Sequence, residues 1–271
     1  PAWPAGPLDP SQDTTATRGS LRLELPAPLT RTLLTRAPAR IGGGVNDVLL
    51  CGFALALAGW QAARGLPADA LFELEGHGRE PLVEGADISR TVGWFTSQFP
   101  LRLALPDSAE DDDALDLALK SVKDQLRALP GNGVGYGLLR WLDEIGRAAL
   151  AGHAAPWIGF NYLGRFGTPG EGGSGDDHAA PCPAPFQPAP EAPALLGFED
   201  PRRALSNVLE LNAMTLDGPA GPRLIANWSF APGVIAADDI RSLAEGWFAY
   251  LRAIAAQAEG GGSTLLTPSD V

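Results

Sequence analysis

The sequence predicts an α/β fold, a two-layer sandwich in which a mixed sheet is flanked by helices. Segments with helical periodicity and segments that alternate like strands follow one another loosely along the chain, which is the order that α/β proteins show. Late in the chain, two strand-like runs flank Asp217-Gly218, a pair typical of a hairpin turn. An antiparallel hairpin beside helix-linked strands predicts a mixed sheet rather than a parallel one.

The first quarter of the chain predicts an extended lead-in, a strand and two helices. The strand alternates apolar and charged residues, and three consecutive glycines separate the helices. We expect Asn46 or Asp47 to cap the second helix, which is apolar nearly all round and should be buried on both sides. Within it, Cys51 is predicted to be a small core residue. The expected ranges are 1–19 for the lead-in, 21–25 for the strand, and 26–36 and 46–64 for the helices.

The next part of the chain predicts two strands and one amphipathic helix. Trp94 is expected in the core, with a platform for the substrate as the alternative. The helix carries Leu and Val on one stripe, and the carboxylates of Asp111 to Asp113 suit its positive N-terminus. These carboxylates stand in a run, without a loop to wrap a cation, so we interpret them as capping groups and not as a metal site. The expected ranges are 70–75 and 99–105 for the strands, 81–89 for a loop and 111–129 for the helix.

The rest of the chain begins with a glycine-rich stretch, 130–137. No Gly-Lys-Ser/Thr follows it, and its spacing fits no nucleotide-binding loop, so nucleotide binding is rejected. Residues 166–198 are rich in Pro, Gly and Ala and lack periodicity, which predicts a disordered insertion or a functional crossover. Asp238 or Asp239 is expected to cap the last helix. The expected ranges are 138–150 and 238–259 for helices, and 157–162, 205–215 and 224–230 for strands.

Composition limits the classes of function. The net charge of −12 argues against a nucleic-acid or anionic-membrane partner. The two cysteines, Cys51 and Cys182, give neither a disulfide framework nor a metal-ligand spacing. No secretory signal opens the chain, and the longest apolar run, residues 48–60, is too short to span a bilayer. We therefore expect a soluble, cytoplasmic protein with no membrane contact.

The stretch of greatest chemical interest follows the strand at 70–75. Residues 75–80 read EGHGRE, so a carboxylate, an imidazole and a guanidinium stand where a strand opens into a loop. Sites tend to be built at such loops. The alternative is a polar turn with a surface ion pair, since charged turns are common.

EGHGRE resembles a signature of the epimerization domains of nonribosomal peptide synthetases, which belong to the condensation-domain superfamily. Five further segments resemble motifs of the same domains, in the same order, over about residues 40 to 270. A set of six in order is far more specific than any one of them. The five are NDVLL at 46–50, RTVGWFT at 90–96 with Pro100, PGNGVGYG at 130–137, FNYLG at 160–164 and TPSD at 267–270.

The resembled domains have two lobes of a chloramphenicol acetyltransferase-like fold, and the N-terminal lobe carries an HHxxxDG motif with the catalytic histidine. The three histidines of this chain, His77, His153 and His178, are not adjacent, and that motif is absent. The resemblance therefore implies that residues 20–259 form the C-terminal lobe alone. It also implies that 260–271 are a linker to a following module and that the chain is a segment of a larger polypeptide.

The resemblance implies inversion at the Cα of an aminoacyl or peptidyl thioester. The substrate would hang on the 4'-phosphopantetheine arm of a peptidyl carrier domain, with the missing lobe and neighbouring synthetase modules as further partners. No metal and no directly bound cofactor are implied. Such a reaction needs a base near one face of Cα, a proton donor near the other, and stabilisation of the enolate oxygen.

Site residues carry over from the matching motifs. Glu75 would be the catalytic base or acid, and Arg79 would orient a carboxylate or contact the arm. Asn161 and Tyr162 would hydrogen-bond the enolate or the carbonyl as catalytic groups, although only one of two successive strand residues should face the cleft. His77 would contact the substrate through a titratable ring or serve as a shape-determining residue.

Two other functions stay open. The chain could be a lobe of a condensation domain that forms peptide bonds, or a binding module that only docks carrier or neighbouring domains. EGHGRE, RTVGWFT and FNYLG together favour the epimerase.

Overall fold

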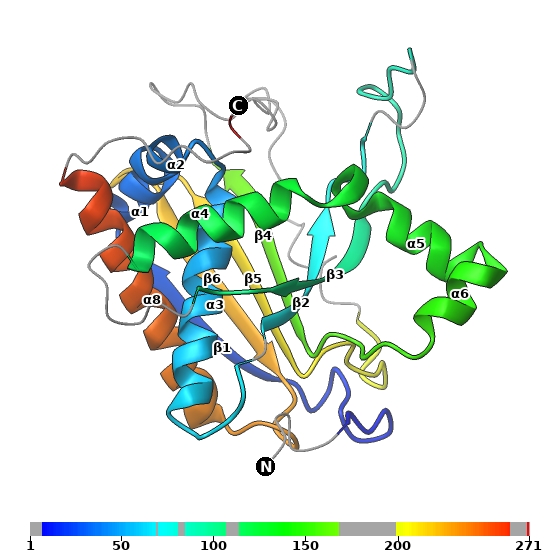
Figure 1. Ribbon diagram of the computed structural model, residues 1–271. Coiled ribbons are helices and arrows are strands. Elements are labelled where there is room, and N and C mark those ends of the chain that lie inside the picture. The colour runs from blue at the N-terminus through cyan, green and yellow to red at the C-terminus, as the bar shows by residue number, and fades with distance from the viewer. Residues whose placement is uncertain are drawn as a thin grey trace.

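The computed structural model of the protein describes residues 7–68, 70–80, 85–106, 114–167, 199–260 and 270. Within them, six strands form one sheet in the order β1-β6-β5-β4-β2-β3 (Figure 1). The pairs β5-β4 and β4-β2 are parallel, and the other three pairs are antiparallel. The expected mixed sheet is therefore confirmed. The strands are β1 (Gly19–Leu25), β2 (Ala70–Gly76), β3 (Ser97–Leu103), β4 (Ile158–Phe166), β5 (Leu209–Leu216) and β6 (Arg223–Phe230).

Most of the helices gather on one side of the sheet, where α3 and α8 lie side by side (Figure 1). Helices α5 and α6 extend beyond the β3 edge, away from this layer. The bounds are α1 (Ala27–Leu34), α2 (Arg36–Ile41), α3 (Val45–Ala62), α4 (Ala114–Arg127), the 3-10 turn η1 (Pro130–Gly133), α5 (Val134–Trp141), α6 (Glu144–Leu150) and α8 (Ala237–Glu259).

An aromatic cluster joins the helix layer to the sheet. The ring of Phe53 on α3 lies 5.2 Å from Phe72 on β2, 6.0 Å from Phe160 on β4 and 5.2 Å from Trp228 on β6. Trp228 meets Trp247 of α8 edge to face at 5.7 Å. Both tryptophans and Phe53 are fully buried. Aromatic pairs at these spacings add to the free energy gained by burying apolar area, so this cluster is the centre of the core.

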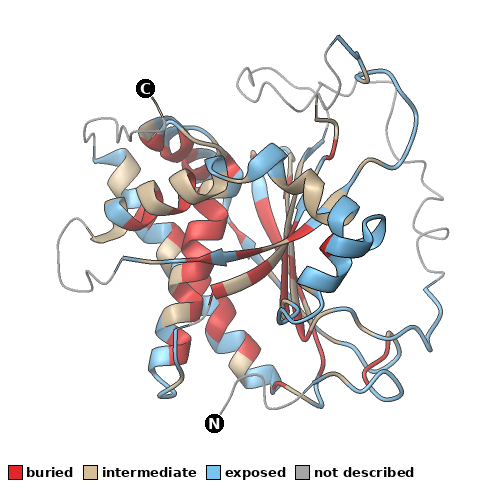
Figure 2. Cartoon of the chain, turned by 45° about the vertical axis from the view of Figure 1, so that its right-hand side comes forward, coloured by how far each residue is buried: buried red, intermediate tan, exposed pale blue. Residues whose placement is uncertain are grey.

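Helix α3 is the core helix that the sequence predicted. Most of its residues are buried, including Cys51 (Figure 2). Its length and composition would allow it to cross a membrane, but 67% of that window is buried inside the fold. The apolar stripes expected on α4 and α8 also face the core. Burial between the sheet and neighbouring helices explains why α3 is apolar on all sides.

The opposite face of the sheet is polar. Strand alternation turns Phe72 and Leu74 of β2 toward the helices and leaves Glu73 and Glu75 on the other face. Register places Gly159 and Glu210 in one row with Glu73, across β4 and β5. The next row along contains Glu75, Asn161 and Asn212. Two rows of polar residues thus lie on a face that the main helix layer does not cover.

Part of the glycine-rich stretch 130–137 is helical. The single helix expected at 138–150 is therefore wrong in its start and in its continuity. Gly131 and Asn132 have positive φ values of 52° and 50°, and they interrupt the helical path between α4 and α5. Helix α5 therefore already begins at Val134 and includes the Gly-Tyr-Gly sequence, and α6 follows as a separate helix. The helix expected over 26–36 is likewise divided, into α1 and α2.

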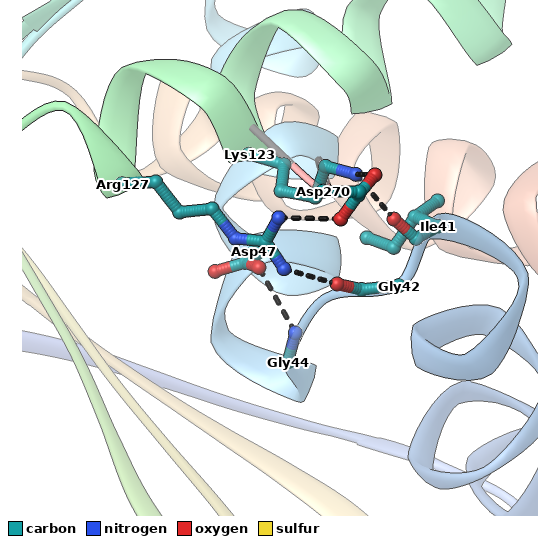
Figure 3. Close-up of polar contacts among 7 residues, drawn as sticks. All are labelled: Ile41, Gly42, Gly44, Asp47, Lys123, Arg127 and Asp270. Carbon is teal, nitrogen blue, oxygen red and sulfur yellow. Dashed lines mark hydrogen bonds and ion pairs between the residues drawn. The ribbon is translucent and has the colours of Figure 1, made fainter. Parts of the chain in front are cut away.

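The predicted caps are also corrected. Helix α3 starts at Val45, and Asp47 lies inside its first turn, where its Oδ2 accepts the Gly44 N–H at 2.9 Å (Figure 3). Ala236 is the N-cap residue of α8 and makes no side-chain hydrogen bond to the helix. Asp238 and Asp239 lie in the first turn. Carboxylates there still favour the helix through its dipole.

Trp94 is 92% exposed, so the prediction that it lies in the core is wrong. Neighbouring Phe95 takes the inward position, beneath the guanidinium of Arg79 at 4.2 Å.

Some of the predictions concern residues outside the part of the chain that the structure describes. These are residues 1–6 of the lead-in, 81–84 of the expected loop, Asp111 to Asp113, Cys182, His178, residues 168–198 of the expected insertion, and residues 261–269 and 271 of the expected linker, which include 267–269 of TPSD. The remaining residue of that motif, Asp270, lies against α4 beside the turn between α2 and α3 (Figure 3).

Candidate active site

The EGHGRE stretch begins at the end of β2 and turns on Gly78. Gly78 has φ +66° and is buried against the backbone of Phe95, where a Cβ would overlap the carbonyl oxygen. Only glycine fits both the backbone conformation and the space. This close approach joins the EGHGRE loop to the segment that contains RTVGWFT.

His77 uses both ring nitrogens within this loop. Nδ1 accepts the backbone N–H of Arg79 at 3.0 Å, and Nε2 lies 3.3 Å from Oε1 of Glu80. An acceptor at Nδ1 assigns the proton of the neutral ring to Nε2, which then donates to Glu80. His77 therefore shapes the loop, although 63% of its side chain stays exposed.

Glu80 connects the loop to the glycine-rich stretch. Its Oε2 accepts from Nδ2 of Asn132 at 2.9 Å, while its Oε1 faces His77. On the same turn, a Cβ at Gly133 would overlap the Phe99 ring. Three of the motifs found in the sequence thus meet at one end of β2 and β3.

Arg79 lies away from Glu75. Its Nη1 donates to the carbonyl oxygen of Ile88 at 2.7 Å, and its guanidinium lies over the Phe95 ring. These contacts tie the loop to the segment at 88–95. The described contacts of Arg79 therefore support the loop and do not pair it with the Glu75 carboxylate.

Glu75 stands on β2 between strands β3 and β4, with its carboxylate on the polar face. Oε1 accepts from Nε2 of Gln98 at 3.1 Å, and Oε2 accepts from Nδ2 of Asn161 at 2.7 Å. Each oxygen therefore has an amide donor from a different neighbouring strand. The structure brings Glu75 and Asn161 together.

Tyr162 points to the other face of the sheet. Its phenol oxygen lies 3.0 Å from Oγ1 of the fully buried Thr215, and its ring packs against the core. Successive residues of β4 alternate, so Asn161 is the member of the pair beside Glu75. The structure therefore does not place Tyr162 with Glu75 and Asn161.

A cavity opens on the polar face beside Glu75. Its lining includes Glu73, Gly159 and Glu210 from the sheet, and Arg18 and Glu199 from the segments that border it. Arg18 and Glu199 form an ion pair at 2.9 Å. The cavity offers a polar, charged surface next to the candidate acid–base group.

Glu73 is the titratable neighbour that sequence reasoning missed. Burial raises the pKa of its carboxyl, and the charges of Glu75 and Glu210 raise it further, against a hydrogen bond from Asn207 and the charge of Arg140. The signal was present in the sequence, because alternation puts residues 73 and 75 on one face. Glu210 and Gln98 were missed because strand pairing brings them here from distant positions.

No group of three or more His, Cys, Asp or Glu side chains that could hold a metal ion occurs among the residues that the structure describes. The chemistry of the described face rests on carboxylates, amides and the neighbouring arginine.

The profile of the condensation-domain family matches residues 6–169. Among curated proteins, one of the subunits of linear gramicidin synthase from Brevibacillus parabrevis is 38% identical over 268 residues, which is 97% of this chain and 3% of that protein. Chondramide synthase cmdD of Chondromyces crocatus is 46% identical over 164 residues, or 60% of this chain and 4% of that protein. The chain thus spans a small part of these relatives.

Solved structures of peptide-synthetase domains are also similar to this chain. The epimerization domain from the third module of tyrocidine synthetase B is similar with a TM-score of 0.72 and 28% identity, over 92% of this chain and 50% of that one. The first condensation domain of the CDA synthetase shares the fold, with a TM-score of 0.51 and 19% identity over 92% of this chain and 47% of that one. The chain spans about half of each solved domain.

Proposed function

The chain belongs to the condensation-domain family, and from that membership we propose that it is the C-terminal lobe of a peptide-synthetase epimerization domain. In this function the Glu75 carboxylate transfers the Cα proton of a thioester-bound aminoacyl or peptidyl group. The product is the epimer at that carbon.

The observation that carries the proposal is the setting of Glu75. Its carboxylate is held by amides on both oxygens, beside a cavity and at the start of EGHGRE. A positioned carboxylate with room beside it is what general acid–base catalysis requires. The similarity to a solved epimerization domain, at 28% identity, supports the choice of reaction.

Inversion at Cα needs groups on both sides of the carbon. A base removes the proton from one face, the electron pair moves into the thioester carbonyl to give an enolate, and an acid delivers a proton to the opposite face. Glu75 supplies one of these groups. We assign the other to the half of the solved epimerization domain that this chain does not span.

The proposed substrate is delivered on the 4'-phosphopantetheine arm of a carrier domain, and no other cofactor takes part. Carrier domains and neighbouring synthetase modules are the proposed partners, in the cytoplasm. The net charge of −12 fits protein partners better than nucleic acid.

The test is Glu75→Gln in the complete two-lobe domain with a loaded carrier domain. The substitution keeps the size of the side chain and removes its titratable charge, so epimerization should fall about 10²- to 10⁴-fold. Chirality after hydrolysis is followed from the L- and from the D-substrate, together with Cα deuterium washout. Loss in one direction with washout retained makes Glu75 one member of a two-base pair.

Glu24→Gln is the matched control, because Glu24 is a glutamate of β1 that pairs with Arg22 and Arg223 at 3.0 Å and 2.9 Å. It should leave the rate unchanged. Wild-type rates for Glu75→Gln in both directions remove Glu75 from the mechanism. Rapid formation of the D-form by this chain alone refutes the requirement for a second lobe.

A condensation-domain lobe is the second candidate, and the match to the condensation-domain profile favours it. Two loaded carrier domains distinguish the reactions: peptide-bond formation without a change of chirality supports condensation. Tight binding of the carrier domain without either reaction supports a docking module.

A further inference from the structure

The carboxylate of Glu75 is held from two sides by side-chain amides of different origin. Asn161 belongs to the FNYLG segment, whereas Gln98 lies between RTVGWFT and Pro100, outside the motif residues. In the antiparallel register of β2 and β3, Gln98 stands directly opposite Glu75. Directly paired residues have Cβ atoms close enough for side-chain contact, so the strand register places the Gln98 amide beside the Glu75 carboxylate.

The geometry of the two hydrogen bonds fixes the plane of the carboxylate. Nε2 of Gln98 donates to Oε1 at 3.1 Å, and Nδ2 of Asn161 donates to Oε2 at 2.7 Å. With one donor on each oxygen, the side chain loses its rotation about the last bond. Each oxygen keeps a further lone pair for a proton or a substrate group.

From this arrangement we infer that Gln98 is a positioning residue for the reaction of Glu75. The inference rests on the proposed function, in which Glu75 transfers the proton. Asn161 alone would leave Oε1 without a donor on the β3 side, and the carboxylate would then be free to turn about its hydrogen bond at Oε2. A misplacement of a reacting group by about 1 Å costs on the order of 10²-fold in rate.

Neither Gln98 nor Glu75 is buried, so the hydrogen bond between them adds little to the stability of the fold. Its loss should therefore be visible in catalysis and not in folding. That difference separates a positioning role from a structural one.

The experiment compares two substitutions in the complete domain with a loaded carrier domain. Gln98→Met keeps the length of the side chain and removes the donor, and kcat for epimerization should fall about 10- to 100-fold with KM unchanged. Gln98→His restores an N–H donor the same number of bonds from Cβ without a fixed positive charge beside Glu75, and part of kcat should return. Thermal unfolding of both variants should match wild type.

The matched control is Asn212→Leu. Asn212 stands in the same row of the polar face and donates at 2.9 Å to Oε1 of a different glutamate, Glu210. Its replacement should leave kcat unchanged. An equal loss of kcat in this control and in Gln98→Met overturns the inference, because the effect would then come from the polar face as a whole.

Two outcomes separate this inference from the proposed function. If Glu75→Gln abolishes epimerization while Gln98→Met retains the wild-type kcat, Gln98 has no positioning role and the proposed function stands. If Glu75→Gln retains the wild-type rate in both directions, the proposed function fails and the inference falls with it.

Discussion

Lys123 donates through Nζ to Oδ2 of Asp270 at 2.6 Å, and no part of the lysine side chain is exposed to solvent. The same ammonium donates to the carbonyl oxygen of Ile41 at 2.6 Å, and Arg127 adds a second ion pair to Asp270 at 2.5 Å. Figure 3 shows Arg127 also donating to the carbonyl of Gly42, at the turn between α2 and α3. Asp270 therefore compensates a buried positive charge and ties residue 270 to α4 and, through Lys123, to the end of α2.

Asp270→Asn should destabilise the protein. Removal of one partner from a buried ion pair costs about 3–5 kcal/mol, and the Asp47 carboxylate, which also interacts with Lys123, compensates part of that loss. Denaturant unfolding measures the loss. Asp200→Asn is the control, since Asp200 makes an exposed pair with Arg202 at 3.1 Å, and it should unfold like wild type. Equal midpoints for Asp270→Asn and wild type would show that the buried ammonium does not depend on this carboxylate.

Gly78→Ala should displace the segment that contains Phe95. A Cβ at position 78 would overlap the Phe95 carbonyl oxygen, so the two segments must separate. Gly65→Ala controls for backbone strain, because Gly65 has φ +65° against +66° for Gly78, and no atom lies within 4 Å of the place that its Cβ would take. It should cost about 1 kcal/mol.

Hydrogen exchange over residues 85–96 reports the displacement. Faster exchange there in Gly78→Ala, and not in Gly65→Ala, is the expected result. Equal exchange in both variants would show that the two motifs do not depend on each other for their packing.

Glu73→Gln should change the dependence of stability on pH. Burial raises the pKa of the Glu73 carboxyl above its ordinary value of 4.5, so above that pH the folded state holds a proton that the unfolded state has lost. The contribution of Glu73 to the free energy of unfolding is fully present below pH 4.5. It is lost as the pH rises through the pKa that Glu73 has in the folded state. The free energy of unfolding of the variant, minus that of wild type, should therefore increase with pH over this window.

Urea unfolding at a series of pH values gives this difference. A difference that stays constant with pH, or one that decreases as pH rises, would contradict a raised pKa at Glu73.

Helices α5 and α6 expose an apolar surface that should associate. Among its residues, Trp141 is 69%, Leu142 79% and Ile145 81% exposed, and the helices stand apart from the main helix layer (Figures 1 and 2). Exposed apolar patches of this kind mark interaction sites. Light scattering of the isolated chain should show a mass that grows with concentration.

Leu142→Gln combined with Ile145→Glu should lower this association. Leu117→Gln is the control, because Leu117 is a 39% exposed leucine on α4. A wild-type chain that stays monomeric at high concentration would contradict the prediction.

Local pattern in the sequence determined much of the fold. The stripe on α8 and the alternation in β1 and β2 reflect which side of an element is apolar, and that property follows from spacing alone. The order of the six motifs along the chain was enough to indicate the family. Strand alternation predicted that only one of Asn161 and Tyr162 faces the polar side, and the structure shows that it is Asn161.

Only the tertiary structure decided which side chains meet. The amides of Gln98 and Asn161 reach Glu75 from positions 23 and 86 residues away in the sequence. Strand order and register cannot be deduced from local periodicity. Trp94 is exposed while Phe95 makes the contact with Arg79, and Asp270 pairs with a buried lysine. Each outcome depends on distant partners whose positions are fixed only when the sheet and helices pack.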